Sequence, residues 1–244
     1  MRKLAVLPAA LVAAAVVAAP AAAQVPETTF KATAKVSPKK AGTKKNPQGV
    51  TISGKLEFET ITQGVEPPII TGGDVLLPKG GTYNGGKYKT CSGKKMRDAQ
   101  GIEPCPKTSL MGQGSGVALA DTVDAKPDVK FVNGGKNTIW AFTTLYNPAL
   151  VQEPIAINIK KLNSAKWGYR ASFKVPKILQ VVAGVPITLR SFNFNIGGKK
   201  YAKDYIVTTS CPSSKKYPYE ATASYLYNDG TTSKSTYKST VPCS

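Results

Sequence analysis

This sequence contains no histidine among its 244 residues. That absence excludes Ser-His-Asp and Cys-His nucleophilic sites, together with the commonest general base at neutral pH. It also excludes most hydrolytic zinc sites, because their ligand sets include histidine. The four cysteines show no C-x-x-C spacing, so an all-cysteine zinc site is not expected either. We therefore predict no metal and no cofactor, and we assign no catalytic residue.

Arginine is scarce as well. Beyond Arg2 near the start, the chain has only Arg97, Arg170 and Arg190, so lysine supplies most of its 33 basic residues. These outnumber the 14 acidic residues and give a formal net charge of +19. Specific readout of phosphates or bases favours the bidentate guanidinium group, whereas lysine suits a diffuse electrostatic surface. A nucleic acid partner is therefore not expected.

Long apolar runs are absent except at the N-terminus. Arg2 and Lys3 precede an apolar run from Leu4 to Ala19, and three alanines end at Ala23. This order is typical of a secretory signal peptide, which predicts cleavage after Ala23. The alternative is a membrane anchor, which would need roughly 20 apolar residues. Pro20 and the alanine-rich end favour cleavage.

The expected product is therefore exported. We predict a signal peptide over residues 1–23 and a single secreted β-sandwich domain over residues 24–244. Loss of two basic residues with the leader would leave 31 basic and 14 acidic residues, a net charge of +17. No later stretch is apolar enough to cross a bilayer, so no membrane span is expected.

Four cysteines in an exported protein indicate disulfides. Cys91, Cys105, Cys211 and Cys243 allow three pairings, and the sequence alone does not choose between them. We favour Cys91–Cys105 and Cys211–Cys243, because both close local loops. Closing a loop of about 15 residues removes roughly 3 kcal/mol of chain entropy from the unfolded state.

Within the first of these loops, the segment SGKKMRDAQG predicts one or two helical turns. Ser92 is a typical N-cap residue. Met96 is expected to face inward, and Gly101 lies near the expected end of the helix.

Strand patterns dominate the rest of the chain. VTISGKLEFETI (50–61) and GYRASFKV (168–175) alternate apolar and polar residues, as half-buried strands do. NTIWAFTTLY (137–146) is apolar on both faces, as a central strand of a two-layer structure would be. Further strands are expected at residues 29–36, 116–120, 129–132, 155–162, 187–194, 205–210, 220–226 and 233–239.

The connections between these strands also favour a β fold. NGG (133–135) and NDG (228–230) are typical hairpin turns, and TTSKSTYKST (231–240) is typical of an exposed edge strand. No helical period lasts three turns outside the disulfide loop. We predict an all-β fold: a two-layer, jelly-roll-like β-sandwich of about ten strands, with one short helical turn in the Cys91–Cys105 loop.

Several motifs occur in a fixed order: VSPKKAGTKK, GVEPP, PCPKTSLMGQGSGVALADT, NPALVQEPI and VAGVPITLRSF. In that order they resemble a family of uncharacterised secreted proteins of soil actinobacteria. The resemblance covers most of the predicted mature chain. It implies export, paired cysteines and a β-rich domain. It implies no activity and no catalytic residue.

Paired carboxylates are the best enzymatic candidates, because glycosidases place two acids beside the scissile bond. Glu66 and Glu153 each precede a proline in a predicted loop, while Glu57 and Glu59 share one face of a strand. The simpler interpretation, which we favour, is that these surface acids balance neighbouring lysines.

Two further segments resemble functional motifs only superficially. Asp121, Asp124 and Asp128 could bind a hard cation, but ADTVDAKPD lacks EF-hand spacing, so solvated loop charges are expected. GQGSG (112–116) fits neither a nucleophile elbow nor a phosphate-binding loop. It predicts a flexible turn that enters a strand.

Basic residues form three clusters along the sequence, within residues 31–55, 87–97 and 199–216, and four tyrosines lie in or just after the third, at positions 201, 205, 217 and 219. Lysine interleaved with tyrosine suits an anionic polymer, although charge that serves only solubility is the simpler interpretation. The residues predicted to bind a polyanion are Lys39, Lys40, Lys44, Lys45, Lys94, Lys95, Lys199, Lys200, Lys215 and Lys216.

The leading hypothesis is a secreted, non-enzymatic β-sandwich that binds anionic cell-envelope polymers or glycans through its lysine surface. The alternative is a secreted carbohydrate-active enzyme, either a glycosidase or a polysaccharide lyase. It would use carboxylates, or a tyrosine base with lysines that neutralise an acidic sugar. A groove with two inward carboxylates, or with clustered Tyr, Lys and Arg, would favour the enzyme.

Overall fold

The structure is a computed structural model that describes residues 28–60 and 68–244. The predicted signal peptide (residues 1–23) and Glu66 lie outside the described residues. Strands form most of the described chain, which confirms the predicted all-β class. The main sheet is antiparallel and follows the order β1-β3-β13-β6-β8-β9-β10-β11-β4-β15-β16. Eleven strands therefore form its path, close to the predicted number.

The strands of this path are β1 (Thr28–Ser37), β3 (Thr51–Thr60), β13 (Val185–Gly197), β6 (Leu110–Ala120), β8 (Asp128–Asn133), β9 (Thr138–Leu145), β10 (Val151–Lys161), β11 (Trp167–Lys174), β4 (Ile69–Pro78), β15 (Lys216–Leu226) and β16 (Thr232–Pro242). Two short strands extend it: β7 (Val123–Ala125) pairs with β6, and β12 (Val181–Val182) pairs with β13. A separate small sheet contains β2 (Gln48–Gly49), β14 (Ile206–Thr208) and β5 (Gly81–Tyr83). The helices are α1 (Gly93–Asp98) and α2 (Lys177–Gln180), with 3-10 turns at Gly85–Lys87 and Lys107–Ser109.

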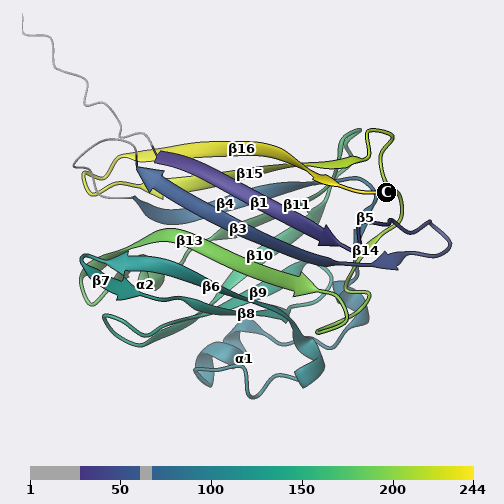
Figure 1. Cartoon of the computed structure of the whole chain (residues 1–244). Helices are drawn as coiled ribbons and strands as arrows, with labels where there is room; N and C mark the ends of the chain where they lie inside the picture. Colours follow the sequence, from purple (N-terminus) through teal and green to yellow (C-terminus); the bar gives the residue numbers. More distant parts are fainter. Residues whose placement is uncertain (1–27, 61–67) are drawn as a thin grey trace, which may run out of the picture.

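The main sheet folds back on itself and nearly closes into a barrel. In Figure 1, β1, β3, β4, β15 and β16 form one layer, and β6, β8, β9, β10 and β13 form the layer beneath it. Side chains from both layers meet in the core, for example Phe58 of β3 and Leu189 of β13. The architecture is thus sandwich-like, although one continuous sheet supplies both layers.

Tyrosine side chains from β15 and from the turn that follows it bridge to β1 where the two ends of the sheet meet. β1 and β16 lie side by side without forming a hydrogen-bonded ladder. The Tyr219 hydroxyl of β15 donates a hydrogen bond to the Ala32 carbonyl oxygen of β1, and the Tyr227 hydroxyl lies 2.9 Å from Thr28 Oγ1. β16 is mostly exposed or half-buried along its length, which confirms the predicted edge strand.

Both faces of β9 are covered, as its apolar sequence predicts. Ile139 and Ala141 pack into the core between the layers. Trp140 and Phe142 face the other way, where they pack beneath the Cys91–Cys105 loop with the fully buried Met96. The disulfide loop therefore covers a patch of the outer sheet face that would otherwise expose apolar side chains to water.

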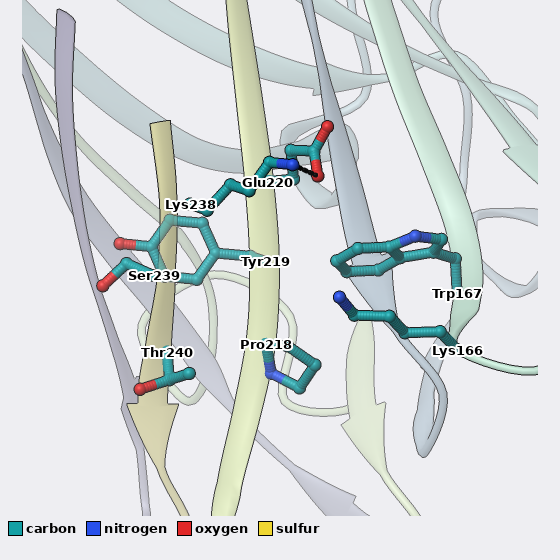
Figure 2. A pocket seen from close by; sticks show the side chains of 8 residues that line it. All are labelled: Lys166, Trp167, Pro218, Tyr219, Glu220, Lys238, Ser239 and Thr240. Atoms are coloured by element: carbon teal, nitrogen blue, oxygen red, sulfur yellow. Dashed lines mark ion pairs between the residues drawn. The ribbon is translucent and has the colours of Figure 1, made fainter. Parts of the chain in front are cut away.

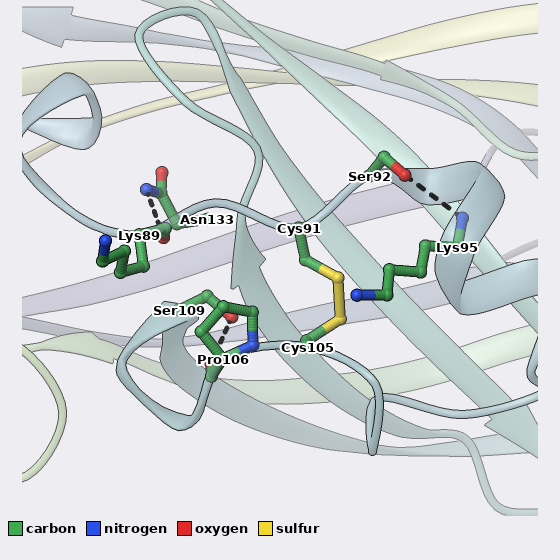
Figure 3. Close-up of a disulfide and its surroundings, with 8 residues drawn as sticks. All are labelled: Lys89, Cys91, Ser92, Lys95, Cys105, Pro106, Ser109 and Asn133. Atoms are coloured by element: carbon green, nitrogen blue, oxygen red, sulfur yellow. Dashed lines mark hydrogen bonds between the residues drawn. A yellow bond between two sulfur atoms is a disulfide. The ribbon is translucent and has the colours of Figure 1, made fainter.

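Both predicted disulfides, Cys91–Cys105 and Cys211–Cys243, are present. Figure 3 shows the first of them beside α1, with Ser92 Oγ accepting a hydrogen bond from the Lys95 backbone N–H at 3.2 Å. The predicted N-cap is therefore confirmed. At the other end the left-handed residue is Gln100 (φ 49°), one position before Gly101, whose N–H donates to the Met96 carbonyl oxygen.

The prediction of a flexible turn at GQGSG (112–116) is wrong, because this segment lies inside β6. Its glycines are required by close packing against β13. A Cβ atom on Gly112 would lie 2.3 Å from the Asn195 carbonyl oxygen, and one on Gly114 would lie 2.4 Å from the Phe192 ring. Read alone, a glycine-rich segment indicates a turn. Here the glycines instead allow two strands to approach closely.

β4 was not predicted, and its glycines explain why. Gly72 and Gly73 interrupt the apolar pattern of IITGGDVLLP, which lowers its strand signal. A Cβ atom on Gly73 would lie 2.6 Å from the Thr222 carbonyl oxygen and 3.2 Å from the Phe173 ring. The two neighbouring strands thus leave no space for a side chain at this position.

Candidate functional site

Five connections between strands gather at the end of the barrel where β5 and β14 lie (Figure 1). We call this region the basic end and define it as residues 38–50, 79–89, 134–137, 162–166 and 198–215. The small sheet crosses it, because Val207 of β14 pairs with Gly49 on one side and Thr82 on the other. Segments far apart in the sequence thereby form one continuous surface.

Backbone hydrogen bonds hold these segments together. They join Thr209 N to Gly80 O, Val50 N to Ile206 O and Lys79 N to Lys166 O, at 2.7, 2.9 and 3.3 Å. The lysine-rich segment 38–50 is also fixed to the C-terminus. Ala41 N donates to Ser244 O at 2.7 Å, and Ser244 N donates to Lys39 O at 3.0 Å. Ser244 directly follows Cys243, so the second disulfide lies beside this segment.

The basic end carries 13 lysines and one acid, Asp204. All 13 lysines are exposed, and none forms an ion pair with another described residue. The fully described connections at the opposite end (121–127, 146–150, 175–184 and 227–231) carry two lysines and three aspartates. The formal charge of these segments is therefore +12 at the basic end and −1 at the opposite end.

The 13 lysines of the basic end are Lys39, Lys40, Lys44, Lys45, Lys79, Lys87, Lys89, Lys136, Lys166, Lys199, Lys200, Lys203 and Lys215. Seven of the ten predicted polyanion-binding residues are among them. Lys216 is the first residue of β15 and adjoins this surface, whereas Lys94 and Lys95 lie apart on α1. The structure thus brings the first and third sequence clusters together and divides the second.

One lysine of the basic end has an unusual backbone conformation. Lys215 has φ 56°, in the left-handed region, which residues other than glycine adopt at a cost of roughly 1 kcal/mol or more. Its N–H donates to Pro212 O, and its own carbonyl oxygen accepts a hydrogen bond from Cys243 N at 2.9 Å. The Cys211–Cys243 disulfide and this turn together fix the point where the chain enters β15.

A buried polar cluster lies beneath the small sheet. The hydroxyls of Tyr83 and Tyr205 are 3.0 Å apart, and Asn133 Oδ1 accepts from both. Asn133 Nδ2 donates to backbone carbonyl oxygens that include that of Lys89 (Figure 3). These side chains satisfy one another's hydrogen bonds, so the cluster supports the basic end.

The protonation of this cluster argues against a tyrosine base. Burial raises the pKa of Tyr83 to about 12, and burial also raises the pKa of Tyr205 above its usual value. A catalytic tyrosinate would need a pKa lowered towards neutral pH. Tyr83 and Tyr205 therefore stay protonated and serve as structural hydrogen-bonding groups.

Glu153 is not a loop residue, so that prediction is wrong. It lies in β10, where Pro154 is tolerated because the ladder to β11 begins only at Ile157. The Glu153 carboxylate is buried, and both of its oxygens accept hydrogen bonds from Arg97 Nε at 3.0 and 2.9 Å. This ion pair joins α1 to β10, and it uses both carboxylate oxygens of Glu153.

The other predicted acids also have lysine partners or lie apart. Glu57 on the outer face of β3 pairs with Lys55 at 2.6 Å, and this hydrogen bond lowers the Glu57 pKa. Asp124 and Asp128 pair with Lys126 and Lys130. Glu59 and Asp121 are exposed. Across residues 28–60 and 68–244, no three Cys, Asp or Glu side chains are grouped as metal ligands. In the same ranges, no helix is both long and apolar enough to span a membrane.

Two shallow hollows mark the outer surface. The first, of about 260 Å³, lies between Trp167 and the outer face of β15 and β16 (Figure 2). The second, of about 240 Å³, lies over β6, β8 and β13 and is lined by amides such as Gln113 and Asn193. Each hollow has a single acid, Glu220 in the first and Asp128 in the second. Neither therefore has the two carboxylates that glycoside hydrolysis uses.

A scan against protein-family models finds no match to this chain, and a search of curated proteins finds none either.

Proposed function

We propose that this protein is a secreted, non-enzymatic binder of anionic cell-envelope polymers, and that the basic end is its binding surface. The observation that carries the proposal is the concentration of 13 exposed lysines, without ion pairs to described residues, around a single acid. Like charges repel, so gathering them on one surface has an energetic cost that a function must offset. Charge that served solubility alone would be interspersed over the whole surface.

The surrounding structure supports this proposal. The lysines project from a hydrogen-bonded platform that a disulfide and a small sheet hold together. An ordered platform loses less entropy on binding than a mobile tail would. Two disulfides are compatible with an oxidising compartment outside the cytoplasm, where an envelope polymer would be met. The carbohydrate-active enzyme gains no comparable support, because the predicted acids within the described residues are paired with basic residues or lie apart.

Binding of a polyanion should show a strong salt dependence. Each lysine that neutralises a charge on the polymer releases a condensed counterion, so affinity falls steeply as salt rises. The experiment is a salt titration of residues 24–244 against polygalacturonate and against dextran, a neutral glycan. We expect binding to polygalacturonate with a steep negative slope of log K against log salt, and little binding to dextran. Equal binding to both, or a slope near zero, would contradict the proposal.

A further inference from the structure

Trp167 points away from the core, against the alternation of its strand. Tyr169 and Ala171 of β11 pack against the core, so strict alternation would place Trp167 on the same inward face. The register between β11 and β4 shifts between Trp167 and Tyr169, which is a β-bulge at Gly168. A Cβ atom on Gly168 would lie 2.8 Å from the Pro78 carbonyl oxygen. Glycine therefore permits the bulge that turns the indole outward.

The indole lines the first hollow. Figure 2 shows Trp167 on one side and Pro218 of β15 on the other, with Glu220 and Lys238 above them. The Lys166 ammonium lies 4.5 Å from the centroid of the Trp167 ring. Lys166 also belongs to the basic end, so the hollow is continuous with the lysine surface.

We propose that this hollow binds one sugar ring of an acidic polysaccharide, an inference that rests on the proposed function. The apolar face of a pyranose ring would stack on the indole in place of the exposed Lys166 ammonium, since aromatic side chains offer a large apolar surface. A uronic carboxylate on that ring would meet the Lys166 ammonium. The Thr240 hydroxyl and the Glu220 carboxylate, which also pairs with Lys238 at 3.4 Å, would bond to the sugar hydroxyls.

This combination of groups distinguishes between polyanions. A polyphosphate chain carries charge but has no ring to stack, so the lysines alone would bind it. An acidic polysaccharide presents charge and a ring at the same residue, and the hollow places an indole and an ammonium together. The ligand of the basic end is therefore a uronate-bearing glycan.

The test compares two polyanions and three variants of residues 24–244. Binding of polygalacturonate and of inorganic polyphosphate is measured by calorimetry at one fixed salt concentration. Trp167→Ala should weaken polygalacturonate binding about tenfold and leave polyphosphate binding within about twofold. Trp167→Phe keeps a ring and should retain most of the affinity. Tyr146→Ala removes an aromatic ring that is 59% exposed at the opposite end, and it should change neither affinity.

A second measurement is independent of the affinity values. The chain has two tryptophans, and Trp140 lies beneath the disulfide loop. Adding a galacturonate oligomer should shift the NMR resonance of the Trp167 indole N–H and leave that of Trp140 in place. Trp167→Phe assigns the two resonances.

The outcomes separate this inference from the proposed function. If wild type binds neither polyanion, both proposals fail. If it binds both polymers with steep salt dependence, but Trp167→Ala weakens both equally or neither, only the sugar-ring site is wrong.

Discussion

Raising the pH from 10 towards 12 should unfold the protein in one cooperative step. Burial raises the pKa of Tyr225 to about 12 and that of Tyr205 above its usual value, compared with about 10 in the unfolded chain. A raised tyrosine pKa means that the folded state holds its proton more tightly. The stability that this tighter binding contributes is complete below pH 10, and it is lost as the pH rises through the tyrosine pKa of the folded state. Tyr225 is 1% exposed, and by pH 12 it alone should cost about 2 kcal/mol of stability.

Tyrosinate absorbance measured together with circular dichroism tests this expectation. Tyrosinate absorbance should rise only in part while the β signal is intact. The buried tyrosines should ionise only as that signal disappears. The Tyr225→Phe variant lacks one of the tyrosines whose pKa is raised. Its free energy of unfolding should therefore fall less between pH 7 and pH 12 than that of wild type. Ionisation of every tyrosine near pH 10 with the fold intact would contradict the burial of Tyr205 and Tyr225.

Removing the Cys211–Cys243 disulfide should be the most damaging of the conservative changes. The bond closes a loop with a sequence separation of 32, and loss of such a constraint costs about 3 to 4 kcal/mol. For a domain of this size that corresponds to a fall in melting temperature of about 10 °C. We expect the Cys211→Ser/Cys243→Ser variant to weaken polymer binding as well, because Ser244 holds the segment that carries Lys39.

The other disulfide is the matched control. Cys91→Ser/Cys105→Ser should cost about 3 kcal/mol, but its loop covers the outer face of β9 and adjoins the 79–89 segment of the basic end rather than the segment that carries Lys39. Thermal melts and calorimetry on both variants separate stability from binding. If both variants lose polymer affinity equally at a temperature where both are folded, the second disulfide has no special role in the basic end.

Local patterns in the sequence predict local structure well. The disulfide pairing follows from loop length, and the N-cap at Ser92 follows from a short polar side chain before a helical turn. The strand at residues 137–146 follows from apolar residues on both faces. Each of these features depends on neighbours close in the chain.

The candidate site depends instead on long-range pairing. Strand β13 lies between β3 and β6, and this order brings segment 198–215 beside segment 38–50. Composition alone contains no information on that order, so the sequence does not show that the first and third lysine clusters meet at one end of the barrel. The outward turn of Trp167 escapes prediction for a similar reason, because the bulge at Gly168 follows from contact with β4. The lysine clusters, one of them interleaved with tyrosine, are the signal in the sequence that points to the basic end.

The central claim is that the position of the lysines, rather than net charge, determines binding. Two variants of equal net charge separate these effects. The first replaces Lys39, Lys40, Lys44 and Lys45 of the basic end with glutamine. The second replaces Lys31, Lys174, Lys177 and Lys234, which are exposed and lie outside the basic end. Because all eight side chains are exposed, both variants should fold with nearly unchanged stability.

The deciding measurement is the slope of log K against log salt for polygalacturonate binding by wild type and both variants. The basic-end variant should lose about one unit of slope for each lysine that contacts the polymer, and its affinity at low salt should fall at least about tenfold. The control variant should keep the wild-type slope and stay within about threefold of its affinity. Equal losses in the two variants would show that net charge alone drives binding, and the account of the basic end would be wrong.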